Sequence, residues 1–526
     1  MTGTTAGGHD GATGAVRLVD LLAGLSLVSD LSMAQPAEES LRVTLVATRV
    51  ARHLGLADDR AADVFYTALL QHVGCTGFAH EQAALLGGDD RLVNAAGAKT
   101  DFADPADVFR TFLPELTRGA DVVTRVRLIT AALVRGREID RGVASANCEV
   151  AAAVADRLGL GDGVQRSLMQ VFAWWNGKGE PRGLAGSDIE VATRITQVAA
   201  VAVLFHHLAG PEAALDAVRQ RGGRTLDPDM VDAFAQVGRG LLDETDAVDA
   251  ATAVLECEPA PVQLVTRRSL EDVARAFADV VDLKSPWMHG HSRQVGDLAQ
   301  RAGERLRLPT AASGHLRLAG LLHDIGRVGV ASGVWDKPGP LTTGEREQVM
   351  LHAHHGERIL SRSTTLAPLA AAVGRHHERC DGSGYHRGVT GADLPMDARV
   401  LGAADVYVAL TQDRPHRDAV SPDAAADHLA DAARGGALDA EAVNAVLDAA
   451  GQSDARVSPT WPAGLTDRQI EVLRLLTRGC SNREIARRLV VSPRTAEHHV
   501  QDIYTRIGVS SRAAAAMFAM RHDLVR

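Results

Sequence analysis

The sequence predicts an all-α protein, and three observations support this fold class. Alanine and leucine recur every three or four residues, as in VTLVATRVARHLGL and EVAAAVADRLGL, which is the spacing of one helix face. Glycine- and aspartate-rich breaks such as LGGDD separate these stretches, and strand signals are scarce. The chain of 526 residues is too long for a single core, so we expect about three domains.

The composition is that of an ordinary globular protein, with 46% hydrophobic and 23% charged residues. There is no run of about 18 apolar residues, so we expect no membrane span. The N-terminal stretch MTGTTAGGHDGATGA lacks a charged start before an apolar run, so we expect a disordered tail over residues 1–16 rather than a secretory signal. Five scattered cysteines without a CxxC pair argue against a disulfide framework and favour a cytoplasmic protein.

The net charge of −10 is unevenly distributed along the chain. From Leu465 to Arg526 there are eleven Arg, no Lys and six Asp or Glu, a balance of +5, so the rest of the chain carries −15. A basic C-terminal part on an acidic body is typical of a domain that binds nucleic acid.

The first half of the chain repeats the middle. At an offset of 252 positions, DLSMAQPAEES (Asp30 to Ser40) matches DLKSPWMHGHS (Asp282 to Ser292). At an offset of 205, NGKGEPRGLAG (Asn176 to Gly186) matches DGSGYHRGVTG (Asp381 to Gly391). We therefore predict two tandem helical units, over residues 17–250 and 251–450.

The two copies differ at their polar positions. The first copy has Glu39 for His291, Gln71 for His323, His72 for Asp324, Val171 and Phe172 for His376 and His377, and Ala200 for Asp405. The apolar framework and the glycines remain. We expect the first copy to keep the fold without holding a metal.

The second copy contains a set of metal-ligand residue types on five segments. The candidates are His291, His323, Asp324, His352, His376, His377 and Asp405. Asp405 lies in the apolar stretch RVLGAADVYVAL, where a carboxylate is costly without a partner. Five His and two Asp exceed one tetrahedral zinc and suit two six-coordinate ions, iron or manganese first and magnesium as an alternative. Two such ions can clamp a phosphate during in-line attack, so the set predicts phosphate-ester hydrolysis.

The motifs LLHDIGR, MLHAHHGERIL, HHERCDGSGY and AADVYVAL, in this order, make residues 277–417 resemble the HD-GYP phosphohydrolases, which hydrolyse cyclic di-GMP at a bi- or trinuclear metal centre. The resemblance implies that the seven candidates are the ligands and that Asp324 bridges two metals. It also implies that Arg414 and Arg417 bind substrate phosphates. With it we assign Arg327, with Asp324, to the catalytic machinery, and Arg327 and Tyr385 to substrate binding.

Three positions depart from the family pattern. Arg327 replaces the usual Lys; it keeps the charge and can fork onto a phosphate, but it cannot act as a tunable proton donor. His386 replaces the Pro of GYP, and Trp287 replaces a Glu ligand of the trinuclear members. We therefore expect two metals, and a substrate that is a cyclic dinucleotide or a related phosphoester.

Residues 451–463, rich in Ser, Pro and Gly, predict a linker to a C-terminal domain over residues 464–526. Thr466 with Gln469 and Ser481 with Glu484 have the spacing of capping boxes, and Ser492-Pro493 begins a further helix. With a fourth helix after Ser510, these short helices predict a helix-turn-helix.

This end of the chain closely resembles the LuxR-type DNA-binding domain of four helices, through LTDRQIEVL, SNREIARRL and TAEHHVQDIYTRIGV. The resemblance implies a recognition helix that enters the major groove with Arg494, Thr495, Glu497, His498 and Gln501 on or beside its exposed face. Arg487, Arg488 and Arg506 are the candidates for phosphate contacts. Because such domains read paired half-sites, we expect a homodimer.

Two functions remain open from the sequence. In the first, the protein is a transcription regulator whose metal domain hydrolyses a cyclic dinucleotide or a related phosphodiester. In the second, the metal domain only senses a nucleotide or metal and controls DNA binding without catalysis.

Overall fold

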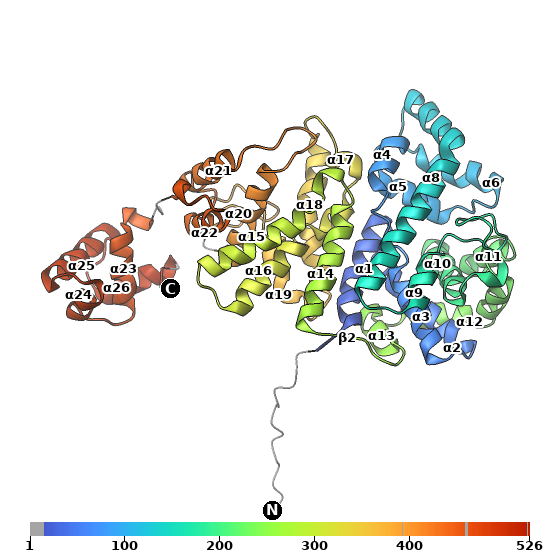
Figure 1. Cartoon of the computed structure of the whole chain (residues 1–526), viewed down its shortest axis with the longest axis horizontal. Coiled ribbons are helices and arrows are strands. Elements are labelled where there is room, and N and C mark those ends of the chain that lie inside the picture. The colour runs from blue at the N-terminus through green and yellow to red at the C-terminus, as the bar shows by residue number, and fades with distance from the viewer. Residues whose placement is uncertain (1–14, 392, 458–460, 523, 526) are drawn as a thin grey trace, which may run out of the picture. The chain divides into compact units, whose positions relative to one another are not determined.

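The computed structural model describes residues 15–391, 393–457, 461–522 and 524–525, and within them the protein is all-α, as predicted (Figure 1). The described strands are the two-residue β1 (Val16–Arg17) and β2 (Leu264–Val265), which pair antiparallel. Of the tail predicted over residues 1–16, residues 1–14 lie outside the described residues, and Val16 belongs to β1.

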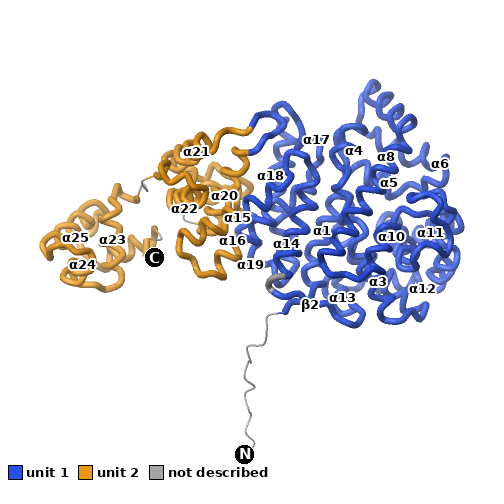
Figure 2. Tube along the Cα trace, viewed as in Figure 1, with its two compact units in different colours: residues 1–296, 317–374, 412–418 blue, residues 297–316, 375–411, 419–526 orange. Residues whose placement is uncertain are grey.

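The chain divides into two compact units (Figure 2). Unit 1 comprises Met1–Gly296, Arg317–Gly374 and Gln412–Asp418, and unit 2 comprises Asp297–Leu316, Arg375–Thr411 and Ala419–Arg526.

The first half of the chain folds into thirteen α-helices, with one π turn and one 3-10 turn, among its described residues. They are α1 (Leu18–Ser32), α2 (Glu39–His53), α3 (Asp58–Leu70), α4 (Ala79–Leu86), α5 (Asp90–Lys99), α6 (Pro105–Asp107), the π turn η1 (Val108–Phe112), α7 (Leu113–Leu116), α8 (Val122–Arg157), α9 (Asp162–Leu168), the 3-10 turn η2 (Gly186–Asp188), α10 (Val191–Ala209), α11 (Pro211–Arg221), α12 (Pro228–Asp246) and α13 (Ala250–Cys257). Helix α10 is, among the described residues, the one helix long and apolar enough to cross a membrane by length and composition, and half of its apolar window is buried within the protein.

Apolar residues at helical spacing build the core of this half. Val46 and Val50 of α2 pack with Ile195 and Val198 of α10 and with Phe234 of α12, all of them buried. Residues three or four positions apart lie on one helix face, so these side chains point to the same side of their helices. The apolar character of α10 is therefore that of a core helix.

Within its described residues, the middle of the chain contributes nine further α-helices. They are α14 (Arg267–Asp282), α15 (His291–Arg305), α16 (Thr310–Leu322), α17 (Ser332–Trp335), α18 (Thr343–Leu360), α19 (Ala367–Gly374), α20 (Met396–Leu410), α21 (Pro422–Arg434) and α22 (Ala440–Ala450), with 3-10 turns η3 (Pro286–Met288) and η4 (Ile325–Gly329). The predicted capping box of Thr342 and Glu345 is present at the start of α18.

The helix boundaries repeat at the offsets found in the sequence. The offset of 252 positions carries α2 (Glu39–His53) onto α15 (His291–Arg305), and α3 (Asp58–Leu70) onto α16 (Thr310–Leu322), without any shift at either end. The offset of 205 positions carries the start of α10, Val191, onto the start of α20, Met396. These coincidences support the proposal that the two halves are copies of one unit.

The C-terminal part forms the predicted four helices, α23 (Asp467–Thr477), α24 (Asn482–Leu489), α25 (Pro493–Ile507) and α26 (Arg512–Arg521). Both predicted capping boxes are present, and Ser492 caps α25 with Pro493 at the first helical position. The expected linker contains two single 3-10 turns, η5 (Ser453–Ala455) and η6 (Pro462–Gly464), and its residues 458–460 lie outside the described residues.

Candidate metal centre

Three helices of the middle segment bring four of the predicted ligands together in unit 1. His291 is the first residue of α15, His323 and Asp324 follow directly after the end of α16, and His352 lies within α18. Gly326 permits the approach of α18, because a Cβ at this position would lie 2.0 Å from the backbone oxygen of His352. All four ligand side chains are buried.

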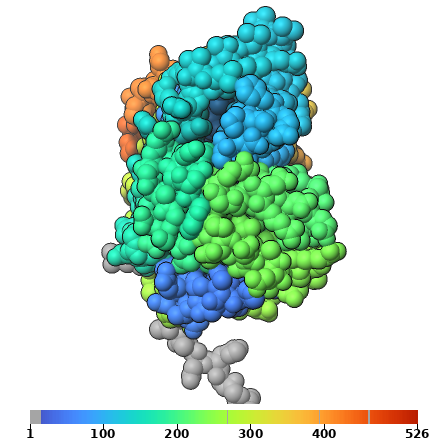
Figure 3. Space-filling view, turned by 90° about the vertical axis from the view of Figure 1, so that its right-hand side faces the viewer, coloured from blue at the N-terminus to red at the C-terminus, as the bar shows by residue number. Residues whose placement is uncertain are grey.

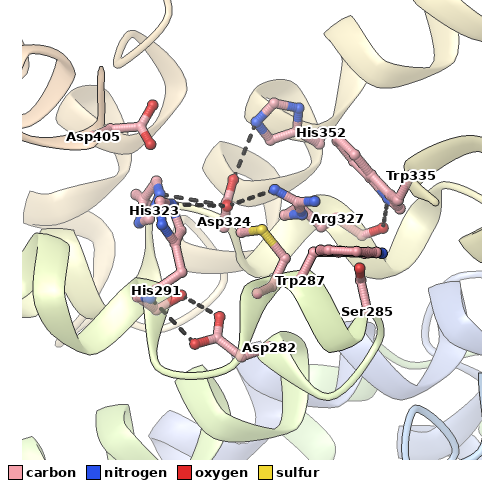
Figure 4. Close-up of polar contacts among 12 residues, drawn as sticks. Asp282, Ser285, Trp287, His291, His323, Asp324, Arg327, Trp335, His352 and Asp405 are labelled. Atoms are coloured by element: carbon pink, nitrogen blue, oxygen red, sulfur yellow. Dashed lines mark hydrogen bonds and ion pairs between the residues drawn. The ribbon is translucent and has the colours of Figure 1, made fainter. Parts of the chain in front are cut away.

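The three imidazoles surround the carboxylate of Asp324 (Figure 4). The Nε2 atoms of His291 and His323 lie 3.8 Å and 3.5 Å from Oδ2 of Asp324. The Nε2 atom of His352 lies 3.3 Å from Oδ1 of the same carboxylate. Ligand atoms of His291, His323 and Asp324 lie within 4.8 Å of one another, which is the arrangement of a metal site.

The other ring nitrogen of each imidazole contacts an oxygen that can only accept a hydrogen bond. Nδ1 of His323 lies 2.7 Å from the carbonyl of Gly320, and Nδ1 of His352 contacts the carbonyl of Val349. Nδ1 of His291 lies 2.9 Å from Oε1 of Gln412. With the proton on Nδ1, each Nε2 directs a lone pair toward the carboxylate, and a cation is the group that suits this donor set.

Charge and burial favour the protonation states in which Asp324 and His352 can bind a metal. Burial alone would raise the pKa of Asp324, but electrostatic interaction with the neighbouring His323, Arg327, His352 and His291 holds it well below its usual range. Burial lowers the pKa of His352, against the opposing effect of Asp324. A carboxylate that stays ionised and an imidazole that stays neutral are the protonation states that metals require.

Arg327 lies against the same carboxylate. Its Nη1 donates to Oδ2 of Asp324 at 3.0 Å, and its guanidinium lies 3.7 Å from the centre of the Trp335 ring. The Trp335 indole donates to the backbone oxygen of Arg327 at 3.2 Å and meets His352 edge-on. Arg327 is thus fixed from two sides, within reach of any anion bound beside Asp324.

Unit 2 brings the remaining three predicted ligands close to one another. His376 and His377 follow α19, and their ring centres lie 4.1 Å apart. Nδ1 of His377 lies 3.9 Å from Oδ2 of Asp405, which is buried in α20 as predicted. The Tyr385 ring stacks on His377 at 4.7 Å, so Tyr385 of the glycine-rich loop lies at the ligands of this unit.

The predicted phosphate-binding arginines lie near His291 within unit 1. Arg414 donates to the carbonyl of Trp287 at 2.7 Å, and its Nη2 donates at 3.3 Å to Oε1 of Gln412, the oxygen that also faces Nδ1 of His291. Arg417 is held by the carbonyls of Gln412 and Asp418. Arg414 is therefore next to the ligands, whereas Arg417 supports the loop beside it.

Three residues of this site were missed from the sequence. Gln412 orients His291, and Trp335 carries Arg327. Buried Glu378 accepts from the backbone of Arg387 and Val389 and so shapes the loop that holds Tyr385. A single Gln, Trp or Glu belongs to no motif whose spacing would identify it as a site residue. For Gln412 the sequence offered one signal, because the offset of 205 positions carries His207 onto it.

The residues predicted to contact DNA are exposed on two helices of the C-terminal part. Arg494, Thr495, Glu497, His498 and Gln501 are exposed on α25, and Arg487 and Arg488 are exposed on α24. Arg506 is also exposed, and it donates to the carbonyl of Gly464 at 2.6 Å. The buried face of α25, with Ala496, Val500 and Ile503, packs into the core of this part.

Two protein-family models match the chain, one in its middle segment and one in its C-terminal part. The model of the HD domain matches residues 275–442, which include all seven predicted ligands. The model of bacterial regulatory proteins of the luxR family matches residues 463–519.

The chain is similar to known cyclic dinucleotide phosphodiesterases, over most of its length in two cases and over about a third in another. It is 30% identical over 411 residues to the 3'3'-cGAMP-specific phosphodiesterase 3 of Vibrio cholerae, covering 78% of this chain and 89% of that protein. The crystal structure of a cyclic GMP-AMP specific phosphodiesterase of V. cholerae matches with a TM-score of 0.58 and 26% identity, over 83% of this chain and 98% of that one. The cyclic di-GMP phosphodiesterase response regulator RpfG of Xanthomonas campestris is 34% identical over 186 residues, covering 34% of this chain and 47% of that protein.

Proposed function

Because the chain belongs to the HD-domain cyclic dinucleotide phosphodiesterases, which are metal-dependent, and carries a LuxR-type DNA-binding domain, we propose that it hydrolyses a 3'3'-linked cyclic dinucleotide and controls transcription. The observation that carries the hydrolytic half is the Asp324 carboxylate, surrounded by three imidazole Nε2 atoms and Arg327. The alternative is a domain that binds the nucleotide without cleaving it.

All seven predicted ligands bind metal in this proposal. His291, His323, Asp324 and His352 supply one group, and His376, His377 and Asp405 supply the other. Both groups lie inside the single HD-domain match over residues 275–442, which supports metal binding by each of them. Five imidazoles and two carboxylates suit two divalent ions, iron or manganese, with magnesium as the alternative. When bound, such ions supply charge neutralisation for a phosphate and lower the pKa of water.

The protein's own residues orient the substrate and its charge. Arg327 is permanently charged and presents its guanidinium beside Asp324, so it neutralises a phosphate oxygen but does not give up a proton. Arg414 offers a second cation, and Arg417 holds the loop of Arg414. Water attacks phosphorus, the bond to the ribose oxygen breaks, and the ring opens to a linear dinucleotide. The leaving oxygen takes its proton from water.

We place 3'3'-cyclic GMP-AMP before cyclic di-GMP as the substrate. The match that extends over 411 residues is to a cGAMP-specific enzyme, whereas RpfG matches over 186 residues. Tyr385, stacked on His377, presents an aromatic surface next to the ligands and suits contact with a nucleobase.

The test is hydrolysis by the full chain loaded with manganese or ferrous iron. We expect linear product from 3'3'-cGAMP, and less from cyclic di-GMP. Asp324→Ala should abolish product and most metal binding, whereas His315→Gln, at an exposed position of α16, should change neither. Tight nucleotide binding without product under any metal would refute the enzyme and leave the sensor. Activity that survives in Asp324→Ala would refute the site.

The LuxR-type domain provides the output of this proposal. Its exposed face on α25 would read base edges in the major groove, and the arginines of α24 would contact phosphates. A protein that acts on the chromosome works in the compartment that holds it, so we assign the protein to the cytoplasm. Paired half-sites require two copies, so we assign a homodimer.

A further inference from the structure

The N-terminal half of α8 presents a row of exposed aliphatic side chains. Val122, Val123, Val126, Leu133 and Val134 are each between 56% and 79% exposed. At about 100° per residue these five side chains fall within an arc of about 120°, which is one face of the helix and which we call the α8 face. Aliphatic side chains gathered in this way on a protein surface mark a site of contact with another molecule.

The opposite face of the same helix is held by a core. Leu128 and Ile139 are buried there, in a cluster with residues of α4, α5 and α7 such as Leu86, Val93 and Leu113. The position of α8 is thus fixed by its buried side. Its exposed side is a firm surface, and no rearrangement is needed to present it.

The α8 face lies on a segment that is one continuous helix in the first copy, whereas the aligned segment of the second copy holds the end of η4 and the four-residue α17. The offset of 205 positions carries Glu138, inside α8, onto Thr343, where α18 begins. Val122–Arg137 therefore extends the helix beyond its counterpart. Figure 3 shows the cyan atoms of this part of the chain standing clear at the top of unit 1. An extension that the repeated fold does not need, and that is apolar on its outer side, requires a separate explanation.

We propose that the α8 face is the surface through which two copies of this chain associate, with the two helices antiparallel about a two-fold axis. A two-fold contact places one patch against the same patch of its partner. With the axis level with Leu128, Val122 meets Val134 of the partner subunit. In the same register, Val123 meets Leu133 of the partner subunit. The aliphatic residues of both copies are then buried against each other.

Charges favour this register. Asp121 caps the N-terminus of α8, and the antiparallel arrangement sets it level with Arg135 of the partner subunit, which also pairs with Glu138 of its own helix. A parallel arrangement would instead set each of these charges against its own copy, which is unfavourable.

The size of the surface fits a pair of copies. Five aliphatic side chains from each copy cover an area on the order of 1,000 Å², which is about the lower bound of a specific interface. The LuxR-type domain supplies the need for a second copy, since such domains read paired half-sites. Association of two copies through the α8 face does not depend on whether the metal centre is catalytic.

Sedimentation velocity of the full chain at micromolar concentration, without DNA or nucleotide, tests the proposal. We expect the wild type to be a dimer and Leu133→Asp to raise the dissociation constant at least about a hundredfold, because an unpaired carboxylate would be buried against Val123 of the partner subunit. Leu208→Asp, at a similarly exposed leucine at the end of α10, should leave the dimer intact. Thermal unfolding of both variants checks that the fold is kept.

Cross-linking tests the register. We expect Val123→Cys and Leu133→Cys, mixed and oxidised, to form a covalent dimer, and each alone to form little. A monomeric wild type, a dimer that survives Leu133→Asp, or cross-linking by each variant alone would overturn the proposal. So would flotation of the wild type with anionic phospholipid vesicles that Leu133→Asp abolishes, since the α8 face would then be a lipid contact.

Discussion

The carboxylate of Glu39 lies 2.7 Å from Nδ1 of His207. The two offsets that align the halves of the chain carry Glu39 onto His291 and His207 onto Gln412, and those two side chains lie 2.9 Å apart. A carboxylate and an imidazole in the first copy thus replace an imidazole and an amide in the second. The first copy keeps the contact between the two helical segments but gives up the ligand.

A second contact is repeated without any change of residue. Ser292 donates from its hydroxyl to Asp282 at 2.7 Å, and Ser40 donates from its hydroxyl to Asp30 at 2.6 Å. The backbone amide of each serine bonds the same carboxylate. This structural pair was kept in both copies, whereas the ligand beside it was kept in only one, which separates the requirements of folding from those of metal binding.

The amide of Gln412 should contribute to metal affinity. Gln412→Met removes the acceptor that holds the Nδ1 proton of His291, and loss of such an outer partner costs about 10- to 100-fold in affinity. Metal titration of the protein stripped with a chelator measures this. Glu39→Gln changes the first-copy residue that corresponds to His291 and contacts the counterpart of Gln412, and it should leave metal affinity and stoichiometry as in the wild type. A lower stoichiometry in Glu39→Gln would mean that the first copy also holds a metal.

The helices and the ligand residue types could be predicted from the sequence, because both produce recognisable patterns of residues along the chain. Hydrophobic periodicity predicted the helices, and the capping boxes at Thr342 and Thr466 predicted the first turns of two of them. The motif around His323 and Asp324 predicted the site. The orientation of each imidazole depends on Gln412 and on main-chain carbonyls, which carry no pattern. The stacking of Trp335 on Arg327 depends on the orientation of the short helix α17, and the length of α8 depends on where its first turn begins. The sequence carries no pattern for either.

Asp30 should make the stability of the protein depend on pH. Burial raises its pKa to about 7, against the hydrogen bonds from Ser40. The folded state therefore holds a proton that the unfolded chain releases above about pH 4, so stability falls by roughly 1.4 kcal/mol per pH unit between about pH 4 and 7. Asp30→Asn removes this dependence. The melting temperature of Asp30→Asn relative to the wild type should rise from pH 5 to pH 8.

An exposed aspartate provides the control for this effect. Asp216 lies on the surface of α11, and Asp216→Asn should give the same difference from the wild type at both pH values. A difference between Asp30→Asn and the wild type that stays constant from pH 5 to pH 8 would show that Asp30 is already ionised in the folded protein.

Trp335 should act as a positioning residue for Arg327. Trp335→Ala removes the ring beneath the guanidinium and the donor to the Arg327 carbonyl. We expect kcat to fall about tenfold, which is the size of one cation–π contact, with metal content unchanged. Trp335→Phe keeps a ring at this place and should recover most of the activity. If both variants lose activity together with metal, Trp335 supports the fold of the site instead of the arginine.

The arginines of the DNA-binding domain should separate into two kinds. Arg494, exposed near the start of α25, is expected to contact a base edge, so Arg494→Ala should cost about 1–3 kcal/mol and relax the preference at one operator position. Arg487, exposed on α24, is expected to contact phosphate, so Arg487→Ala should weaken binding to all sequences and reduce the salt slope by about 1. Binding of selected and scrambled duplexes at several salt concentrations measures both. Arg434→Ala, an exposed arginine of α21, serves as the control, and an equal loss for Arg494→Ala on both duplexes would remove Arg494 from base recognition.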